Sequence, residues 1–118
     1  MHVVRHPGDA GAPVVLLIHG LLDSGASFDG VVDELVPEHT VITYDRRGWG
    51  RSRADAPPRS LAEQAHDAVA ALDGQRATVV GHSYGGVVGL MTAVLRPDLV
   101  ASLAVFEPTV PWTDWWPD

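Results

Sequence analysis

The segment Gly81-His82-Ser83-Tyr84-Gly85 is the part of the sequence best suited to do chemistry. A serine flanked in this way has the form G-x-S-x-G, which suits a sharp turn from a strand into a helix. The two glycines remove Cβ atoms that would clash in such a turn, and the turn leaves the serine hydroxyl exposed. The helix N-terminus behind it favours negative charge that develops during attack on a carbonyl. We therefore predict that Ser83 is a nucleophile, against the plainer interpretation of an ordinary turn serine.

Short apolar runs alternate with longer amphipathic runs, and this alternation predicts how Ser83 is positioned. Apolar residues predict strands over residues 14–19, 40–44, 78–80 and 99–106. Helical spacing predicts a helix over residues 27–36 and another that begins at Ser60, in a capping-box pattern with Glu63, and is terminated by Gly74. A third helix is predicted over residues 85–95, and it is expected to be buried because it is apolar on nearly all sides. The pattern predicts an α/β fold with a partial, doubly wound, mostly parallel sheet and helices on both faces. Sites in such sheets form where the strands end.

Three motifs in chain order resemble the α/β-hydrolase family. They are His19-Gly20 after the first predicted strand, the loop D-R-R-G-W-G-R-S at residues 45–52, and residues 81–86. The first resembles the oxyanion loop of that family, the second its D-x-R-G-x-G-x-S loop, and the third its nucleophile elbow. The resemblance covers residues 13–108 and implies a hydrolase of this fold.

The resemblance also implies roles for individual residues. Ser83 would be the catalytic nucleophile, and the backbone N–H groups of Leu21 and Tyr84 would form the oxyanion hole. Asp45 and Arg47 would organise the neighbouring loop. Glu107, at the end of the last predicted strand, is a possible triad acid. Six residues would shape the site: His19, Gly20, Gly81, His82, Gly85 and Gly86.

The triad base is not found after the elbow. The family's triad runs Ser, then Asp or Glu, then His, whereas all six histidines lie at or before residue 82. A serine hydroxyl is a weak nucleophile without a base. His19 and His82 could be surrogate bases, but a structural role is the preferred interpretation of both.

These observations lead to one expected domain over residues 1–118, an incomplete α/β-hydrolase domain. Its core would span residues 13–108, and residues 109–118 would begin a missing cap or carboxyl-terminal portion. The expected function is hydrolysis of an ester, lactone or related small acyl substrate, with the isolated chain inactive. The alternative is a non-catalytic fragment or binding remnant of such an enzyme. Trp112, Trp115 and Trp116 could line an acyl pocket or belong to a core.

The composition argues against several other classes. The 118 residues contain no cysteine, which excludes disulfides, a thiol nucleophile and cysteine-based zinc sites. A net charge of −7 argues against a nucleic-acid partner, and nucleotide-binding motifs are lacking. No apolar run has the length of a membrane span or signal peptide. We therefore expect a cytoplasmic protein with no cofactor, no metal and no membrane partner.

Two surface features have expected roles that the structure can test. The arginines of residues 46–59 are interpreted as a solvated loop paired with Asp45 and Asp55. The family's sheet order places the strand at 14–19 between those at 40–44 and 78–80, with 99–106 outermost. The outer edge of that last strand would be unpaired, so we expect self-association or pairing there.

Overall fold

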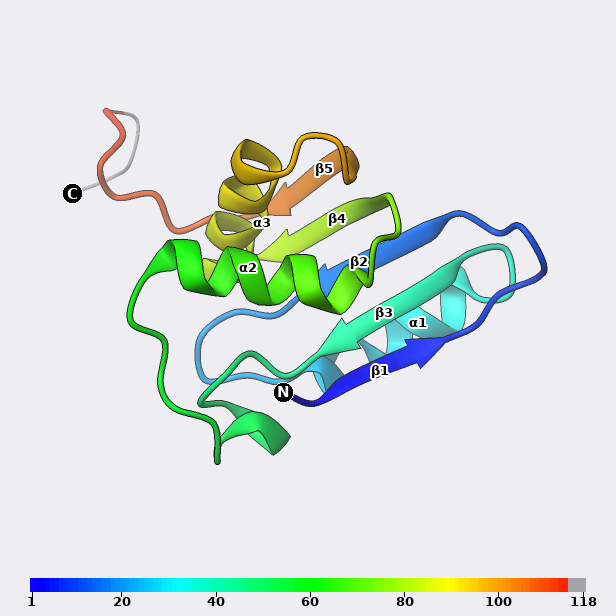
Figure 1. The fold of residues 1–118 in the computed structure, drawn as a ribbon, viewed down its shortest axis with the longest axis horizontal. Coiled ribbons are helices and arrows are strands. Elements are labelled where there is room, and N and C mark those ends of the chain that lie inside the picture. Colours follow the sequence, from blue (N-terminus) through cyan, green and yellow to red (C-terminus); the bar gives the residue numbers. More distant parts are fainter. Residues whose placement is uncertain (115–118) are drawn as a thin grey trace.

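The computed structural model describes residues 1–114 of the chain, and its strands form one sheet (Figure 1). The strand order is β1-β3-β2-β4-β5. The strands are β1 (Val3–His6), β2 (Val14–Ile18), β3 (Thr40–Tyr44), β4 (Ala77–His82) and β5 (Val100–Phe106). Neighbouring strands are parallel except β1, which pairs antiparallel with β3. The predicted α/β fold and the predicted order of four strands are confirmed.

The strand β1 was not predicted from the sequence. It has only four residues, and its side chains alternate between half-buried and exposed, so it lacks the continuous apolar run of a central strand. Its pairing with β3 places Val3 opposite Tyr44, a partner far along the chain. Such a short edge strand is stabilised by its distant partner and has little local signal.

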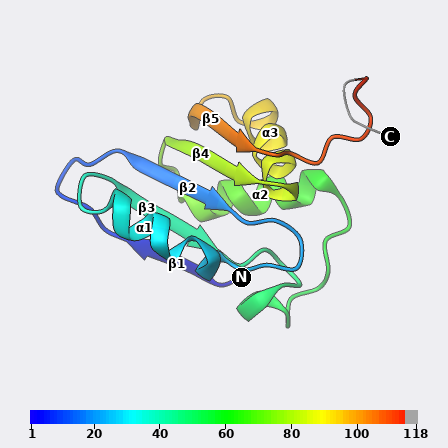
Figure 2. The ribbon, with the colours of Figure 1, turned by 180° about the vertical axis from the view of Figure 1, so that it is seen from behind.

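The helices cover both faces of the sheet, as predicted (Figures 1 and 2). Helices α2 (Leu61–Leu72) and α3 (Tyr84–Leu95) lie on one face, and α1 (Asp29–Leu35) lies on the other. Along β2, Leu16 and Ile18 pack into the first core and Val15 and Leu17 into the second. Because successive strand residues point to opposite faces, β2 is the strand that joins the two cores.

The ends of α2 agree with its predicted capping signals. The hydroxyl of Ser60 accepts a hydrogen bond from the backbone N–H of Glu63. Asp73 then adopts a left-handed conformation with φ of 50°, followed by Gly74, and the helix ends there. The helix predicted over residues 27–36 is shorter than expected, because residues 25–28 form a 3-10 turn before α1.

The prediction that α3 is buried on nearly all sides is wrong for the described part of the chain. Its residues Leu90 and Val94 are exposed, and Val94 keeps 75% of its side chain accessible. The helix packs on β4, β5 and α2, while its outer side has no neighbouring element among residues 1–114. An apolar sequence therefore did not mean a fully enclosed helix here.

The described residues include no helix that is both long and apolar enough to cross a bilayer.

Candidate active site

Ser83 lies at the turn between β4 and α3, where the sequence placed it. Its backbone has φ of 55° and ψ of −123°, a conformation that residues other than glycine rarely adopt. The N–H of Ser83 donates to the carbonyl of Phe106 at 2.9 Å, so the end of β5 stabilises the turn from outside. A strained backbone fixed in this way exposes one side chain at a defined place, which is what a nucleophile needs.

The two glycines around Ser83 are required by close backbone packing. A Cβ on Gly81 would lie 2.3 Å from the carbonyl oxygen of Gly85. A Cβ on Gly85 would lie 2.2 Å from the carbonyl oxygen of Ile18. Gly20 is also close, since its Cβ would be 3.2 Å from the Cβ of Ser83. The elbow is therefore packed directly against the end of β2.

The two predicted oxyanion donors lie on either side of this contact. Tyr84 is the first residue of α3, so its N–H has no acceptor within the helix. Leu21 follows Gly20, which touches the elbow, and its side chain is exposed. Gly86, in the first turn of α3, packs against Pro108. The geometry brings the residues of two motifs, about 60 positions apart, to one point.

His19 is fully buried, and both nitrogens of its ring form hydrogen bonds. Its Nε2 accepts a hydrogen bond from the backbone N–H of Arg46 at 2.9 Å, which requires the proton to be on Nδ1. That Nδ1 lies 2.8 Å from the carbonyl of Gly20 and donates to it. Burial lowers the pKa of His19, which favours this neutral form. Its lone pair is in use, so the ring is not free to take a proton from Ser83.

Arg46 is the largest fully buried side chain and was not predicted to be buried. Its Nε donates to the carbonyl of His19 at 3.1 Å and its Nη2 to the carbonyl of Gly20 at 3.0 Å. Its Nη1 donates to the side-chain oxygen of Gln64. The guanidinium therefore joins the end of β2 to α2. In the sequence, the signal for this contact was Gln64, a polar residue in α2 that faces the sheet.

A cavity of about 380 Å³ adjoins the two predicted oxyanion donors. The guanidinium of Arg46 lies 5.1 Å from the ring centre of Tyr84 and 5.9 Å from that of Trp49. The cavity is therefore walled by aromatic and apolar groups with one cation and one amide. Its lining residues are Leu21, Arg46, Gly48, Trp49, Pro57, Pro58, Gln64 and Tyr84.

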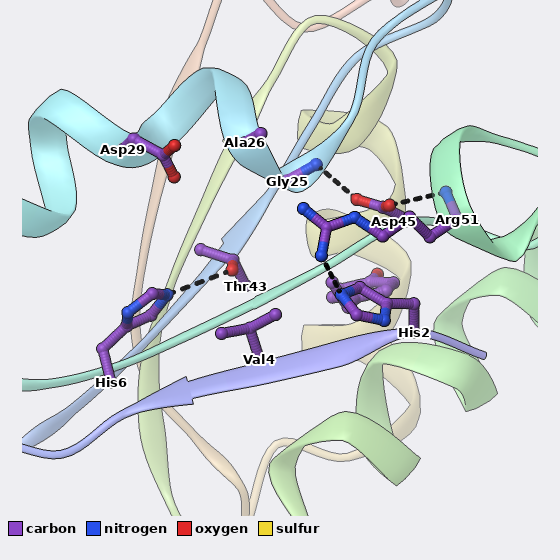
Figure 3. Close-up of a pocket in the computed structure, with 10 residues that line it drawn as sticks. His2, Val4, His6, Gly25, Ala26, Asp29, Thr43, Asp45 and Arg51 are labelled. Atoms are coloured by element: carbon purple, nitrogen blue, oxygen red, sulfur yellow. Dashed lines mark hydrogen bonds between the residues drawn. The ribbon is translucent and has the colours of Figure 1, made fainter.

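Asp45 organises the loop that follows β3, as the sequence suggested. Its carboxylate accepts hydrogen bonds from the backbone N–H groups of Gly25 at 2.7 Å and Arg51 at 2.8 Å (Figure 3). Burial raises the pKa of Asp45, but the two N–H donors outweigh it and hold the pKa below its ordinary value. The cavity drawn in Figure 3 lies beside β1 and α1, and Ser83 is not among its lining residues.

The other arginines of the loop do not form the predicted pairs with Asp45 and Asp55. Arg47 forms a two-pronged ion pair with Asp67 at 2.6 and 2.7 Å and a further pair with Glu63. Arg59 pairs with the same Glu63. The loop is therefore tied to α2, because α2 presents its acidic residues to it.

The remaining candidates lie around the elbow. The ring of His82 stacks on Phe106, with 5.6 Å between ring centres. Glu107 is exposed and has a positive φ of 48° at the turn after β5. The Oγ of Ser83 has a partner that the sequence did not predict, the hydroxyl of Thr109 at 3.2 Å. No sequence signal marked Thr109, since the contact depends on how the chain turns after β5.

One of the three tail tryptophans, Trp112, lies among the described residues. Trp112 is exposed over 68% of its side chain. Trp115 and Trp116 lie outside the described residues, so the predicted acyl pocket formed by all three stays a prediction.

Comparison with known proteins settles the family. The family model described as alpha/beta hydrolase fold matches residues 13–118. The chain belongs to the α/β-hydrolase family. This confirms the resemblance on which the site assignment was built.

Individual relatives show the same fold and differ in their named activities. The chain is 44% identical over 110 residues to RutD of Caulobacter vibrioides, a proposed carbamate hydrolase, covering 89% of this chain and 41% of RutD. It matches an alpha/beta hydrolase from Sphaerobacter thermophilus with a TM-score of 0.77 and 37% identity, over 90% of this chain and 40% of that one.

An enol-lactonase from Burkholderia xenovorans aligns with a TM-score of 0.78 and 26% identity, covering 86% of this chain and 41% of the lactonase. The chain therefore spans about two-fifths of the length of the relatives it matches. The family-model match over residues 13–118 includes the elbow and the loop after β2, the two segments that meet at Ser83.

Proposed function

We propose that this chain carries the nucleophile and oxyanion hole of a serine hydrolase acting on an ester, lactone or related small acyl substrate. The observation that supports this most directly is the strained backbone of Ser83 at the strand-to-helix turn. A fold maintains such strain only where the surrounding packing over-determines it, and functional sites are where it concentrates. Two of the relatives, RutD and the enol-lactonase, are named for hydrolysis of acyl compounds, which supports this choice of substrate class.

In this proposal the Oγ of Ser83 attacks the carbonyl carbon of the substrate. The negative charge that forms on the carbonyl oxygen is stabilised by the N–H groups of Leu21 and Tyr84. The bond to the leaving alcohol then breaks, and that alcohol takes the proton that the serine lost. Water hydrolyses the acyl-serine and restores the hydroxyl. The cavity beside these residues receives the apolar part of the substrate.

The proton taken from Ser83 needs a base, and we propose that a histidine outside these 118 residues supplies it. Among residues 1–114, the side-chain partner of the Ser83 Oγ is the hydroxyl of Thr109, which is not a base at neutral pH. The isolated chain is therefore expected to bind acyl compounds and to turn them over slowly at most.

The test is labelling of the purified chain with an alkyl fluorophosphonate, read by intact mass and peptide mapping. Attack by the serine oxygen forms an oxygen–phosphorus bond and releases fluoride. Because the isolated chain lacks the proposed base, we expect labelling at Ser83 to be slow and to need long incubation at high reagent concentration. The adduct should be lost in Ser83→Ala, while Ser27→Ala, a change at an exposed serine, labels like wild type. A nitrophenyl ester and a nitrophenyl carbamate then compare two substrate classes.

The alternative function, a non-catalytic binding remnant, makes the opposite prediction in this experiment. No adduct at Ser83 after prolonged incubation, together with no ester or carbamate turnover, would favour it. Saturable binding of the same ester by the unlabelled chain would then identify what the remnant retains.

A further inference from the structure

The guanidinium of Arg46 is a buried cation without an acidic partner. It is only 2% exposed, and its three hydrogen-bond acceptors are the carbonyls of His19 and Gly20 and the amide of Gln64. Among residues 1–114, no carboxylate forms an ion pair with it, and Asp23 acts on it only at longer range. Burying a charge against neutral acceptors costs free energy that an acid partner would reduce.

The neighbouring residue Arg47 is an example of a purely structural contact between the same loop and α2. Arg47 is paired with two carboxylates of α2, those of Asp67 and Glu63. Both arginines join the loop to α2, yet only Arg46 is enclosed and left without an acid. Attachment of the loop therefore does not account for the placement of Arg46.

The contact of Arg46 with Gly20 fixes the orientation of a peptide unit. The carbonyl of Gly20 accepts two hydrogen bonds, from the Nη2 of Arg46 at 3.0 Å and from the Nδ1 of His19 at 2.8 Å. A trans peptide is planar, so the N–H of Leu21 points opposite to that carbonyl, away from Arg46. The same peptide lies beside the elbow, because Gly20 contacts Ser83.

We propose that Arg46 is a positioning residue of the oxyanion hole. It fixes the plane of the Gly20–Leu21 peptide, and its positive charge polarises that peptide so that the Leu21 N–H is a stronger donor. Arg46 has no negatively charged partner in the folded chain. The oxyanion that forms during attack by Ser83 would provide that negative charge. This inference rests on the proposed function, since it needs Leu21 to be an oxyanion donor.

The charge argument follows from the low dielectric around the site. A fixed dipole or charge aimed at a developing oxyanion acts more strongly in a water-excluded site than in water. A cation already neutralised by a carboxylate would contribute little there. Arg46 meets the condition because its acceptors are neutral and because it is buried, with the rings of Trp49 and Tyr84 beside its guanidinium.

The test compares Arg46→Met and Arg46→Lys with Arg53→Met, a matched control at an exposed arginine of the same loop. The first measurement is the rate of fluorophosphonate labelling at Ser83. We expect Arg46→Met to slow it by roughly tenfold to a hundredfold, because loss of one oxyanion donor costs about that much or more. Arg46→Lys keeps the charge and is expected to recover part of the rate. Arg53→Met is expected to label like wild type.

The second measurement needs no activity. Backbone NMR reports the Gly20 carbonyl and the Leu21 amide in wild type and in each variant, with amides of β2 and β4 as reporters of the intact fold. We expect Arg46→Met to shift the Gly20 and Leu21 signals and to speed hydrogen exchange at Leu21, while strand signals stay in place. If Arg46→Met does not fold, Arg46→Lys, which keeps the stem and charge, gives the same comparison.

The outcomes separate this inference from the proposed function. Wild-type labelling at Ser83 with an equal rate in Arg46→Met would overturn the inference and leave the proposed function standing. Shifted Leu21 signals with an unchanged rate would overturn the charge argument. If wild type is not labelled, the proposed function fails, and unchanged Gly20 and Leu21 signals in Arg46→Met would refute the positioning role as well.

Discussion

The carboxyl ends of β2, β3 and β4 differ sharply from the outer side of β5. At the inner ends, His19, Asp45 and Arg46 are buried, and each has defined hydrogen-bond partners. On the outer side, Val105 and Phe106 are exposed, and the edge of β5 has no partner strand among the described residues. The side chains with well-defined hydrogen-bond partners are therefore those enclosed on several sides. Ser83 lies at the boundary between this inner region and the outer side of β5.

The largest expected effect is on the inner side, at the contact of the elbow with β2. Gly85→Ala places a Cβ about 2 Å from a backbone oxygen that cannot move freely, so we expect a loss of about 4 kcal/mol or more in the free energy of unfolding. Urea denaturation measures it.

The matched control for this change is Gly30→Ala in α1. A Cβ there meets nothing within 4 Å, and alanine favours a helix over glycine by about 0.5–1 kcal/mol. We expect this variant to be at least as stable as wild type. Equal stability of the two variants would show that the elbow is not closely packed and would remove the contrast between the regions.

A second, smaller effect is expected at Asp45. Asp45→Asn replaces a carboxylate that accepts two buried N–H groups, at an expected cost of about 2–3 kcal/mol at pH 7. Asp33→Asn, at an exposed position of α1, is the control and should change stability little.

The pH dependence of stability gives the sign of the Asp45 contribution. The pKa of Asp45 is lower in the folded chain than the value of about 3.9 for a free aspartate, so its contribution is fully present above pH ~4. It is lost as the pH falls through the lowered pKa. The difference in stability between wild type and Asp45→Asn should therefore stay constant from pH 7 to about pH 4 and shrink as the pH falls further toward pH 3. A constant difference across that range would contradict the assignment.

The smallest effect on stability, and the largest on solubility, is expected on the outer side. The open edge of β5 is expected to cause self-association of the isolated chain. Val105→Lys places a charge on that edge and should reduce the association, with a stability change within about 0.5 kcal/mol. Analytical ultracentrifugation over a range of concentrations measures it.

The control for the edge is Val94→Lys, since Val94 is a more exposed valine on α3. If both lysines reduce association equally, general hydrophobicity is responsible and not the edge. A wild-type chain that stays monomeric at all concentrations would refute the expectation itself.

Much of the inner region could be predicted from the sequence, because local signals there agree with one another. Strand ends, the glycines of the elbow and the cap at Ser60 each have a short-range physical cause. The burial of Arg46 could not be predicted in this way. An arginine in a loop of arginines looks solvated, and only the meeting of β2, β3 and α2 encloses it. The contact of Thr109 with Ser83 could not be predicted for a similar reason, since it depends on the path of the chain after β5.

The central position of β2 has a consequence for how the protein is made. Its two sheet neighbours are strands that come later in the chain, and its register with β4 joins Val15 to Thr78, roughly 60 residues further on. During synthesis at about 5–20 residues per second, the apolar run of β2 waits for several seconds before β4 has left the ribosome. Over that interval it is an open binding site for a chaperone, so the nascent chain's dependence on chaperones should end once β4 is released.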